Sequence, residues 1–173
     1  MGKVILISGS NGSGKSRFAE ELVGKTVGTR YYIATMVSQS EDNECRIEKH
    51  KRQREGLGFV TLEVPWQVSA VQVEPNSVVL LEDMTNLLGN TVFAHGGCGE
   101  DVYRDICALA DKCRLLIVVT ISGMNSAEYT GETAVYIDSI NELNDRIFAL
   151  ANAAAEMVDG VPQWKKGDIH AID

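Results

Sequence analysis

Short apolar runs rich in Val and Ile recur along the chain. They read KVILI, YYIA, FVTLEV, SVVLL and LLIVVT and occupy residues 3–7, 31–34, 59–64, 77–81 and 115–120. The runs are nearly continuous rather than alternating with polar residues, which is typical of strands buried on both faces of a parallel sheet. We therefore predict five β-strands at these positions.

The runs are separated by segments of helical character, and the last of these shows apolar residues at helical spacing. These segments predict helices over residues 15–24, about 41–55, 99–112 and 133–154. Strands that alternate with helices form right-handed βαβ units, which predicts a doubly wound α/β fold in one domain over residues 1–173. In such folds ligands bind outside the carboxyl ends of the strands. We expect the loops after Ile7, Ala34, Leu81 and Thr120 to meet there.

Composition narrows the functional classes. The 173 residues carry a net charge of −8, and no apolar stretch is long enough to span a bilayer. An acidic chain lacks the basic surface that nucleic acids and anionic membranes require. The four cysteines lie far apart without a C-x-x-C pair, which favours reduced thiols over a zinc site. We expect a cytoplasmic protein that binds neither nucleic acid nor membranes.

The stretch after the first predicted strand has the clearest chemical signal. It fits the phosphate-binding motif G-x-x-x-x-G-K-[ST] without a mismatch, with Gly9, Ser10, Asn11, Gly12, Ser13, Gly14, Lys15 and Ser16. Glycines let successive N–H groups turn toward one anion, and the following helix adds its positive dipole end. Lys15 is expected to reach the β- and γ-phosphates of a nucleotide, and Ser16 to ligate Mg²⁺.

A P-loop site also needs an acidic residue at the end of another strand. The run SVVLLED offers Glu82 and Asp83. Side chains alternate along a strand, so only one of the two is expected to face the site. We predict that Glu82 helps to hold the metal, with Asp83 as second candidate. The alternative is that both are solvated acids at a strand end.

The segment 41–55, EDNECRIEKHKRQRE, is predicted to form a helix with almost no apolar stripe. Its acidic start and basic end suit the helix dipole, and Ser38 with Glu41 predicts a capping box. Five side chains share one face of this helix, namely Arg46, Lys49, His50, Gln53 and Arg54.

That face is suited to phosphate chemistry. A neutral His50 imidazole is a nucleophile toward phosphorus, and the cations around it would stabilise a departing pyrophosphate. The alternative is a solvated helix with ion pairs such as Glu48–Arg52 and Lys51–Glu55, in which His50 is silent.

Several motifs follow one another in a specific order. GSNGSGKS is followed by YYIAT, by R-I-x-x-H-K-x-x-R over residues 46–54, and by F-x-T-x-E-x-P over residues 59–65. In this order they resemble the adenosylcobinamide kinase/adenosylcobinamide-phosphate guanylyltransferase family of cobalamin biosynthesis. VVLLEDMTNLLGN and AEMVDGVP extend the likeness over nearly the whole chain. The P-loop is generic, whereas R-I-x-x-H and T-x-E-x-P make the resemblance specific.

The resemblance implies a RecA-like parallel sheet, a homotrimer and two linked reactions. In the first, ATP or GTP phosphorylates the aminopropanol hydroxyl of adenosylcobinamide. In the second, GMP passes from GTP to that phosphate through a covalent guanylyl-histidine, here His50, with Mg²⁺, Lys15 and Glu82 assisting. The residues implied to line the guanine nucleotide are Ala34, Thr35, Lys51, Arg52, Gln53, Arg54 and Glu63.

The chain departs from the family pattern after its last apolar run. The family carries V-T-N-E-V-G there, whereas this chain reads VTISGM, and Asp83 stands where the family usually has Cys. A switch GTPase is disfavoured because no N-K-x-D follows that run. Two alternatives stay open: another small P-loop kinase acting on a metabolite hydroxyl, and a nucleotide-binding module without catalysis.

Overall fold

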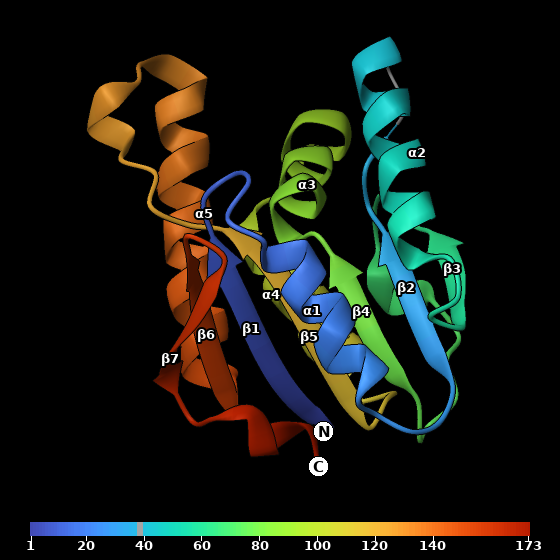
Figure 1. Cartoon of the computed structure of the whole chain (residues 1–173). Coiled ribbons are helices and arrows are strands. Elements are labelled where there is room, and N and C mark those ends of the chain that lie inside the picture. Colours follow the sequence, from blue (N-terminus) through green and yellow to red (C-terminus); the bar gives the residue numbers. More distant parts are fainter. Residues whose placement is uncertain (38–39) are drawn as a thin grey trace.

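The computed structural model describes residues 1–37 and 40–173 and is built around one seven-stranded sheet (Figure 1). The strand order is β3-β2-β4-β5-β1-β6-β7, and all neighbours are parallel except β6 and β7. The strands are β1 (Lys3–Gly9), β2 (Arg30–Ala34), β3 (Phe59–Glu63), β4 (Val78–Glu82), β5 (Leu115–Ile121), β6 (Ala153–Val158) and β7 (Val161–Lys166). The five predicted strands and the doubly wound, mainly parallel architecture are confirmed.

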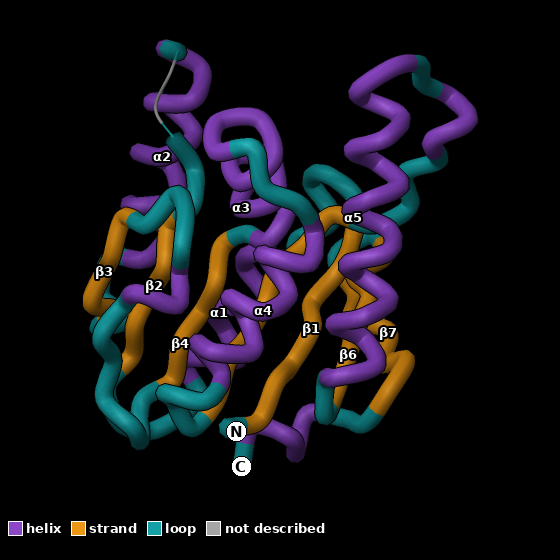
Figure 2. The backbone as a smooth tube through the Cα atoms, turned by 180° about the vertical axis from the view of Figure 1, so that it is seen from behind, coloured by secondary structure: helices purple, strands orange, loops and turns teal. Residues whose placement is uncertain are grey.

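Helices cover both faces of the sheet. They are α1 (Lys15–Gly24), α2 (Glu41–Arg54), α3 (Met84–Gly89), α4 (Gly99–Ala110) and α5 (Gly131–Leu150), with short helical segments at Val68–Ala70, Asn90–Ala94, Ser126–Glu128 and Ile169–Ile172. Helix α1 lies on one face, and α4 and α5 lie on the other, as the view from behind shows (Figure 2). Helix α2 extends past the carboxyl end of β2, so it stands over the edge where the predicted ligand loops meet (Figure 1).

The core has two halves, one on each face of the sheet. In β1, Val4 and Leu6 pack on the side of α4 and α5, and Ile5 and Ile7 pack on the side of α1. None of these four side chains is more than 3% exposed. Burial on both faces explains why the strands read as continuous apolar runs.

The prediction of a helix over 133–154 is wrong at its end. Helix α5 stops at Leu150, and residues 153–158 form β6, which pairs with β1. Asn152 makes the switch, since its N–H donates to the Val4 carbonyl at 2.8 Å and its Oδ1 accepts from the Val4 N–H at 2.8 Å. Alanine favours helices, but here small residues are needed to pack a buried strand, so tertiary pairing overrides propensity.

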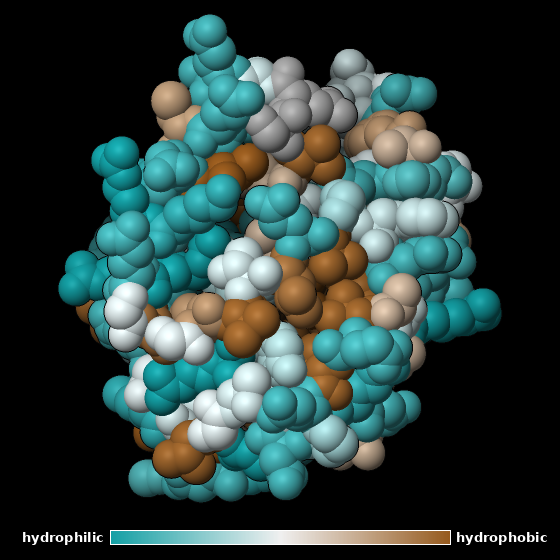
Figure 3. Space-filling view, turned by 90° about the vertical axis from the view of Figure 1, so that its right-hand side faces the viewer, coloured by the Kyte–Doolittle hydropathy of each residue, from teal (hydrophilic) through white to brown (hydrophobic). Residues whose placement is uncertain are grey.

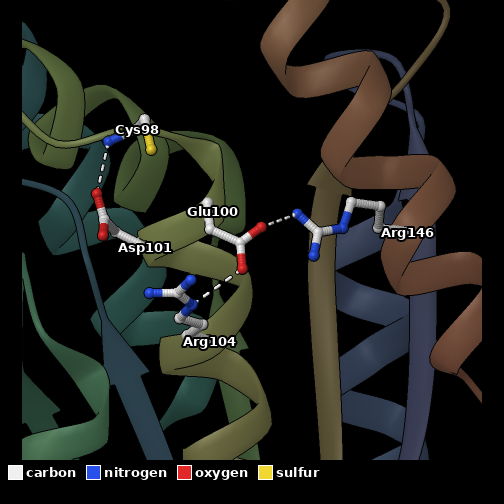
Figure 4. A network of polar contacts seen from close by, with 5 residues as sticks. All are labelled: Cys98, Glu100, Asp101, Arg104 and Arg146. Carbon is white, nitrogen blue, oxygen red and sulfur yellow. Dashed lines mark hydrogen bonds and ion pairs between the residues drawn. The ribbon is translucent and has the colours of Figure 1, made fainter.

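A polar cluster joins α4 to α5 behind the sheet (Figure 4). Arg146 of α5 donates to Glu100 of α4 at 2.6 Å, and Arg104 donates to the same carboxylate at 2.9 Å. The guanidinium of Arg146 also lies 3.7 Å from the centre of the Tyr103 ring. This cluster, together with the apolar core beneath it, holds α5 and therefore β6 against the rest of the sheet.

The residue that caps the start of α2 is not the predicted one. The predicted capping residue Ser38 lies outside the described residues, and Ser40 caps α2 by accepting from the Asn43 N–H at 3.2 Å. Strand β3 is at the sheet edge. The side of the molecule that lies to the right in Figure 1 is mostly hydrophilic, with an apolar area near its centre (Figure 3). Among the described residues, no helix is long and apolar enough to cross a membrane.

Candidate functional site

A cavity of about 680 Å³ opens at the carboxyl edge of the sheet. It is bounded by the P-loop, by one face of α2 and by the ends of β2, β3 and β4. This is the edge at which ligands bind in open α/β sheets. Of the four loops expected to meet there, those after β1, β2 and β4 contribute to the cavity, whereas the loop after Thr120 supplies none of its described lining residues.

The P-loop supplies the floor of the cavity. Five of its residues line the cavity, namely Asn11, Gly12, Gly14, Lys15 and Ser16. The other three, Gly9, Ser10 and Ser13, belong to the loop but do not line the cavity. Gly14 has a φ of 89° and caps α1 without any side-chain hydrogen bond. The first N–H groups of α1 are thus available to an anion, with the helix dipole behind them. The Lys15 Nζ donates to the Ser10 carbonyl at 3.1 Å, which holds the lysine across the loop.

The loop is fastened to its neighbours through its backbone. The Ser122 N–H, after β5, donates to the Gly9 carbonyl at 3.0 Å, and the Gly160 N–H, in the β6–β7 turn, donates to the Ser13 carbonyl at 3.2 Å. A Cβ on Gly9 would come within 2.3 Å of the Ser13 Oγ, so the close packing of the loop requires glycine there.

Ser16 and Glu82 meet at the predicted metal position. The Ser16 hydroxyl donates to Glu82 Oε1 at 2.6 Å, and Glu82 Oε2 is buried with no hydrogen-bond partner in the described part of the chain. Burial, followed by the charge of Asp83, raises the pKa of Glu82 to about 8. A buried carboxyl group with an unpaired oxygen beside a hydroxyl fits Mg²⁺, whose charge would favour the ionised form of Glu82. The ion takes one or two protein oxygens and completes its shell with phosphate and water.

Both acids at the end of β4 reach the cavity, contrary to the expectation that only one would. Asp83 follows the last strand residue, so strand alternation does not govern it, and its Oδ1 accepts from the Asn86 N–H at 2.7 Å to cap α3. Thr35 supports this turn from below, since its Oγ1 accepts from the Asp83 N–H at 2.9 Å. Thr35 is fully buried and does not line the cavity, whereas Ala34 does.

The predicted face of α2 turns toward the P-loop. Arg46, Lys49, His50, Gln53 and Arg54 all line the cavity. The ion pair proposed for a purely solvated helix exists at Glu48 and Arg52, whose charged atoms are 4.0 Å apart, and Arg52 does not line the cavity.

Lys51 forms an ion pair across to the edge strand. Its Nζ lies 3.9 Å from Glu63 Oε1, so the structure brings together two of the residues expected near the nucleotide, and both line the cavity.

His50 is half-buried among cations. Its pKa is lowered, first by burial and then by the charges of Arg54, Arg46 and Lys49. The imidazole is therefore neutral at pH 7, which is the nucleophilic form. Its Nδ1 is buried without a hydrogen-bond partner among the described residues.

Several site residues escaped the sequence analysis. Tyr32 and Thr61 line the cavity one step below Ala34 and Glu63, and the parallel register pairs Tyr32 with Thr61 and Ala34 with Glu63. The two-residue period of strands was the signal that could have identified them. Asn90 is different, because its Nδ2 donates to the carbonyls of Thr35 and Pro65, which fastens the loops after β2 and β3. That role depends on tertiary contacts.

The strand–loop–helix cradle around Lys15 and the Ser16–Glu82 contact, set on this sheet, define a P-loop nucleotide-binding protein with a RecA-like fold. Solved structures agree on the fold. A prototypical ATPase from the type III secretion system of pathogenic bacteria has a TM-score of 0.59 at 9% identity, covering 99% of this chain and 60% of that one. The PH0250 protein from Pyrococcus horikoshii OT3 has a TM-score of 0.53 at 8% identity, covering 95% of this chain and 86% of that one.

Sequence comparison identifies the family. The model described as "Cobinamide kinase / cobinamide phosphate guanyltransferase" matches residues 5–164, and the chain belongs to that family of kinases and guanylyltransferases. The bifunctional adenosylcobalamin biosynthesis protein CobU of Escherichia coli strain K12 is 29% identical over 91% of this chain and 97% of its own length. The protein of the same name from Salmonella typhimurium strain LT2 is 26% identical over the same shares.

Proposed function

We propose that this enzyme phosphorylates the aminopropanol hydroxyl of adenosylcobinamide and then transfers GMP from GTP to the new phosphate through His50. The observation that carries the proposal is the placement of His50. Its neutral imidazole shares one cavity with the P-loop, and the cations Arg46, Lys49 and Arg54 surround it.

In the kinase step the acceptor hydroxyl oxygen attacks the γ-phosphorus of the nucleotide. The bond from that phosphorus to the bridging oxygen breaks, the nucleoside diphosphate leaves with the electron pair, and the hydroxyl proton is released. The P-loop amides and Lys15 would hold the phosphates and balance the charge that develops on the leaving group. ATP and GTP both offer the phosphates that this cradle recognises.

Ser16 and Glu82 would hold Mg²⁺ in this cavity. When bound, the ion neutralises charge on the β- and γ-phosphates. The 2.6 Å distance between the Ser16 Oγ and Glu82 Oε1 atoms supports this assignment.

In the guanylyl step an imidazole nitrogen of His50 attacks the α-phosphorus of GTP. A P–N bond forms, the bond to the β-phosphate oxygen breaks, and pyrophosphate leaves with the electron pair. A phosphate oxygen of adenosylcobinamide phosphate then attacks the same phosphorus, and the P–N bond breaks to regenerate the imidazole. Arg46 and Lys49 would stabilise the departing pyrophosphate. Glu63 and Lys51 line the cavity and would contact the nucleotide.

Label transfer tests both halves. The protein is incubated with Mg²⁺ and with GTP labelled at either the α- or the γ-phosphorus, with and without adenosylcobinamide. We expect acid-labile α-label on the protein, absent from His50→Ala, and γ-label on the corrinoid.

The possible outcomes separate the alternatives. Corrinoid phosphorylation without protein-bound α-label would refute the guanylyl half and leave a kinase. Nucleotide binding without any transfer would indicate a binding module. The His50→Ala variant is the control for the kinase half, since it should still phosphorylate adenosylcobinamide.

We also propose that the enzyme works as a homotrimer in the cytoplasm. Family membership supports this, because the resemblance implies a trimer. Light scattering should give three times the chain mass of 18.9 kDa. A monomeric mass at working concentration would refute the trimer.

A further inference from the structure

Helix α2 is held to the protein in an unusual way. It spans 14 residues, and Arg54 in its last turn is the only one that is buried, at 8% exposure. The face that it turns inward consists mainly of polar and cationic side chains over the cavity. Apolar burial, which normally fixes a helix on a sheet, is therefore nearly absent here.

Arg54 makes a specific contact with the sheet. Its guanidinium lies 3.6 Å from the centre of the Tyr32 ring in β2. Tyr32 is itself only 2% exposed and packs edge-to-face on Phe59 of β3, with ring centres 5.6 Å apart. A desolvated cation over a buried ring is the strong form of the cation–π interaction.

Other contacts also surround the end of α2. Glu20 of α1 is 5% exposed, and the charge of Arg54 partly offsets the rise that burial causes in the pKa of its carboxyl group. The chain just after α2 is fixed as well, because the Leu57 N–H donates to the Arg54 carbonyl at 3.1 Å and Arg30 donates to the Leu57 carbonyl at 3.0 Å. The contacts that fix α2 to the sheet are thus concentrated at the carboxyl end of the helix.

We propose that Arg54 is a positioning residue that acts through Tyr32 to fix His50 over the P-loop. His50 lies four residues before Arg54, one turn away on the same face of α2. The contact between Arg54 and Tyr32 fixes the position and rotation of the last turns of α2 relative to the sheet. It thereby fixes the direction from which the His50 imidazole attacks the α-phosphorus. This inference rests on the proposed role of His50 and gives Tyr32, which the nucleotide chemistry does not require, a part in the guanylyl step.

The test compares two variants that remove this contact from opposite sides, Arg54→Leu and Tyr32→Leu. At saturating GTP we expect each to slow labelling of His50 by about tenfold or more, because small misplacements of reacting groups are costly. The KM for GTP should change less. The double variant should be no slower than the slower single one, since both remove one interaction.

Conservative variants and a distant arginine provide the controls. Tyr32→Phe keeps the ring and should label at nearly the normal rate, and Arg54→Lys should be intermediate because it keeps the charge without the planar fork. Arg104→Leu removes an exposed arginine on α4, far from the cavity, and should leave the rate of His50 labelling unchanged. If Arg54→Leu raises KM with an unchanged rate at saturation, or if Tyr32→Leu labels normally, Arg54 is a nucleotide ligand and the proposal is wrong.

Hydrogen exchange without nucleotide tests the anchor independently of catalysis. In both leucine variants the amides of α2 should exchange faster, while those of β4 and β5 keep their protection. Unchanged exchange in α2 would overturn the anchor. A wild-type protein that takes no label from GTP would refute the guanylyl-histidine instead, and the exchange result would still stand.

Discussion

The two halves of the cavity are built on opposite principles. The P-loop lies between β1 and α1, and α1 buries Ala19, Leu22 and Val23 completely. The opposite wall is α2, which buries only Arg54. One wall is an extension of the core, and the other is a charged helix held at one end.

The difference follows from what each wall presents to the ligand. The P-loop binds phosphate mainly with backbone N–H groups, so the side chains of α1 are free to pack in the core. Helix α2 offers side chains instead, and the cations and imidazole that it directs at the cavity cannot also be buried in apolar surroundings. A site that binds its ligand through backbone N–H groups is compatible with a rigid core behind it. A site that binds through charged side chains, as on α2, loses most of the stabilisation that apolar packing would provide.

Replacing Lys15 by Ala should have the largest effect. Both activities need the triphosphate held in place, so we expect both rates to fall by about 10²–10³-fold, as when a preorganised charge-stabilising donor is removed. His50→Ala should abolish only the guanylyl transfer. Rates from γ- and α-labelled GTP measure the two losses. If His50→Ala lost both activities equally, the P-loop and α2 would not serve separate steps of the reaction.

Core truncation should distinguish the walls by stability. Leu22→Ala in α1 removes a fully buried side chain and should lower the free energy of unfolding by about 2–5 kcal/mol. Lys49→Ala in α2 should change it by less than about 0.5 kcal/mol. Urea unfolding monitored by circular dichroism gives both values. A comparable loss in the two variants would contradict the contrast between the walls.

Glu20→Gln should stabilise the protein at alkaline pH. Burial raises the pKa of Glu20 from 4.5 to about 7, so the unfolded chain releases this proton first and the stability declines as the pH rises between those values. Glutamine carries no such cost. The variant should gain up to about 3 kcal/mol at pH 8 and nothing at pH 4. Thermal unfolding at both pH values measures this, and a gain independent of pH would show another origin.

The smallest expected effect concerns the pKa of His50. Burial and the nearby cations lower this pKa below 6.5, so kcat/KM for His50 labelling should fall only as the pH drops below that value. Lys49→Gln removes one of those cations and should raise the pKa of His50. NMR titration of the His50 imidazole measures the shift. A downward shift would show that Lys49 acts other than by its charge.

The sequence predicted one wall better than the other. Continuous apolar runs and an exact P-loop motif identify β1 and α1, because burial and backbone geometry restrict the residues that fit. On α2 the helical period correctly grouped five of the cavity-lining side chains but could not show which of them is buried. Arg54 is buried against Tyr32, and that contact joins segments that are distant in the sequence.

Other misses share that cause. Thr35 was expected near the nucleotide but supports the turn at Asp83, and the alanines of β6 were assigned to a helix. Both depend on which strands become neighbours. The hairpin after β6 did carry a local signal, since Asp159-Gly160 is a sequence typical of two-residue β-turns, with φ of 49° and 78° here.

That hairpin has a practical consequence for engineering. Its tip is exposed and at first sight suits the insertion of an epitope or a fluorophore. Yet the Gly160 N–H donates to the Ser13 carbonyl, and the Gly160 Cα would be 3.6 Å from a Cβ on Gly14. An insertion there would disturb the phosphate cradle from outside. The two chain ends lie together at the opposite edge of the sheet (Figures 1 and 2), and a reporter attached there leaves the cradle untouched.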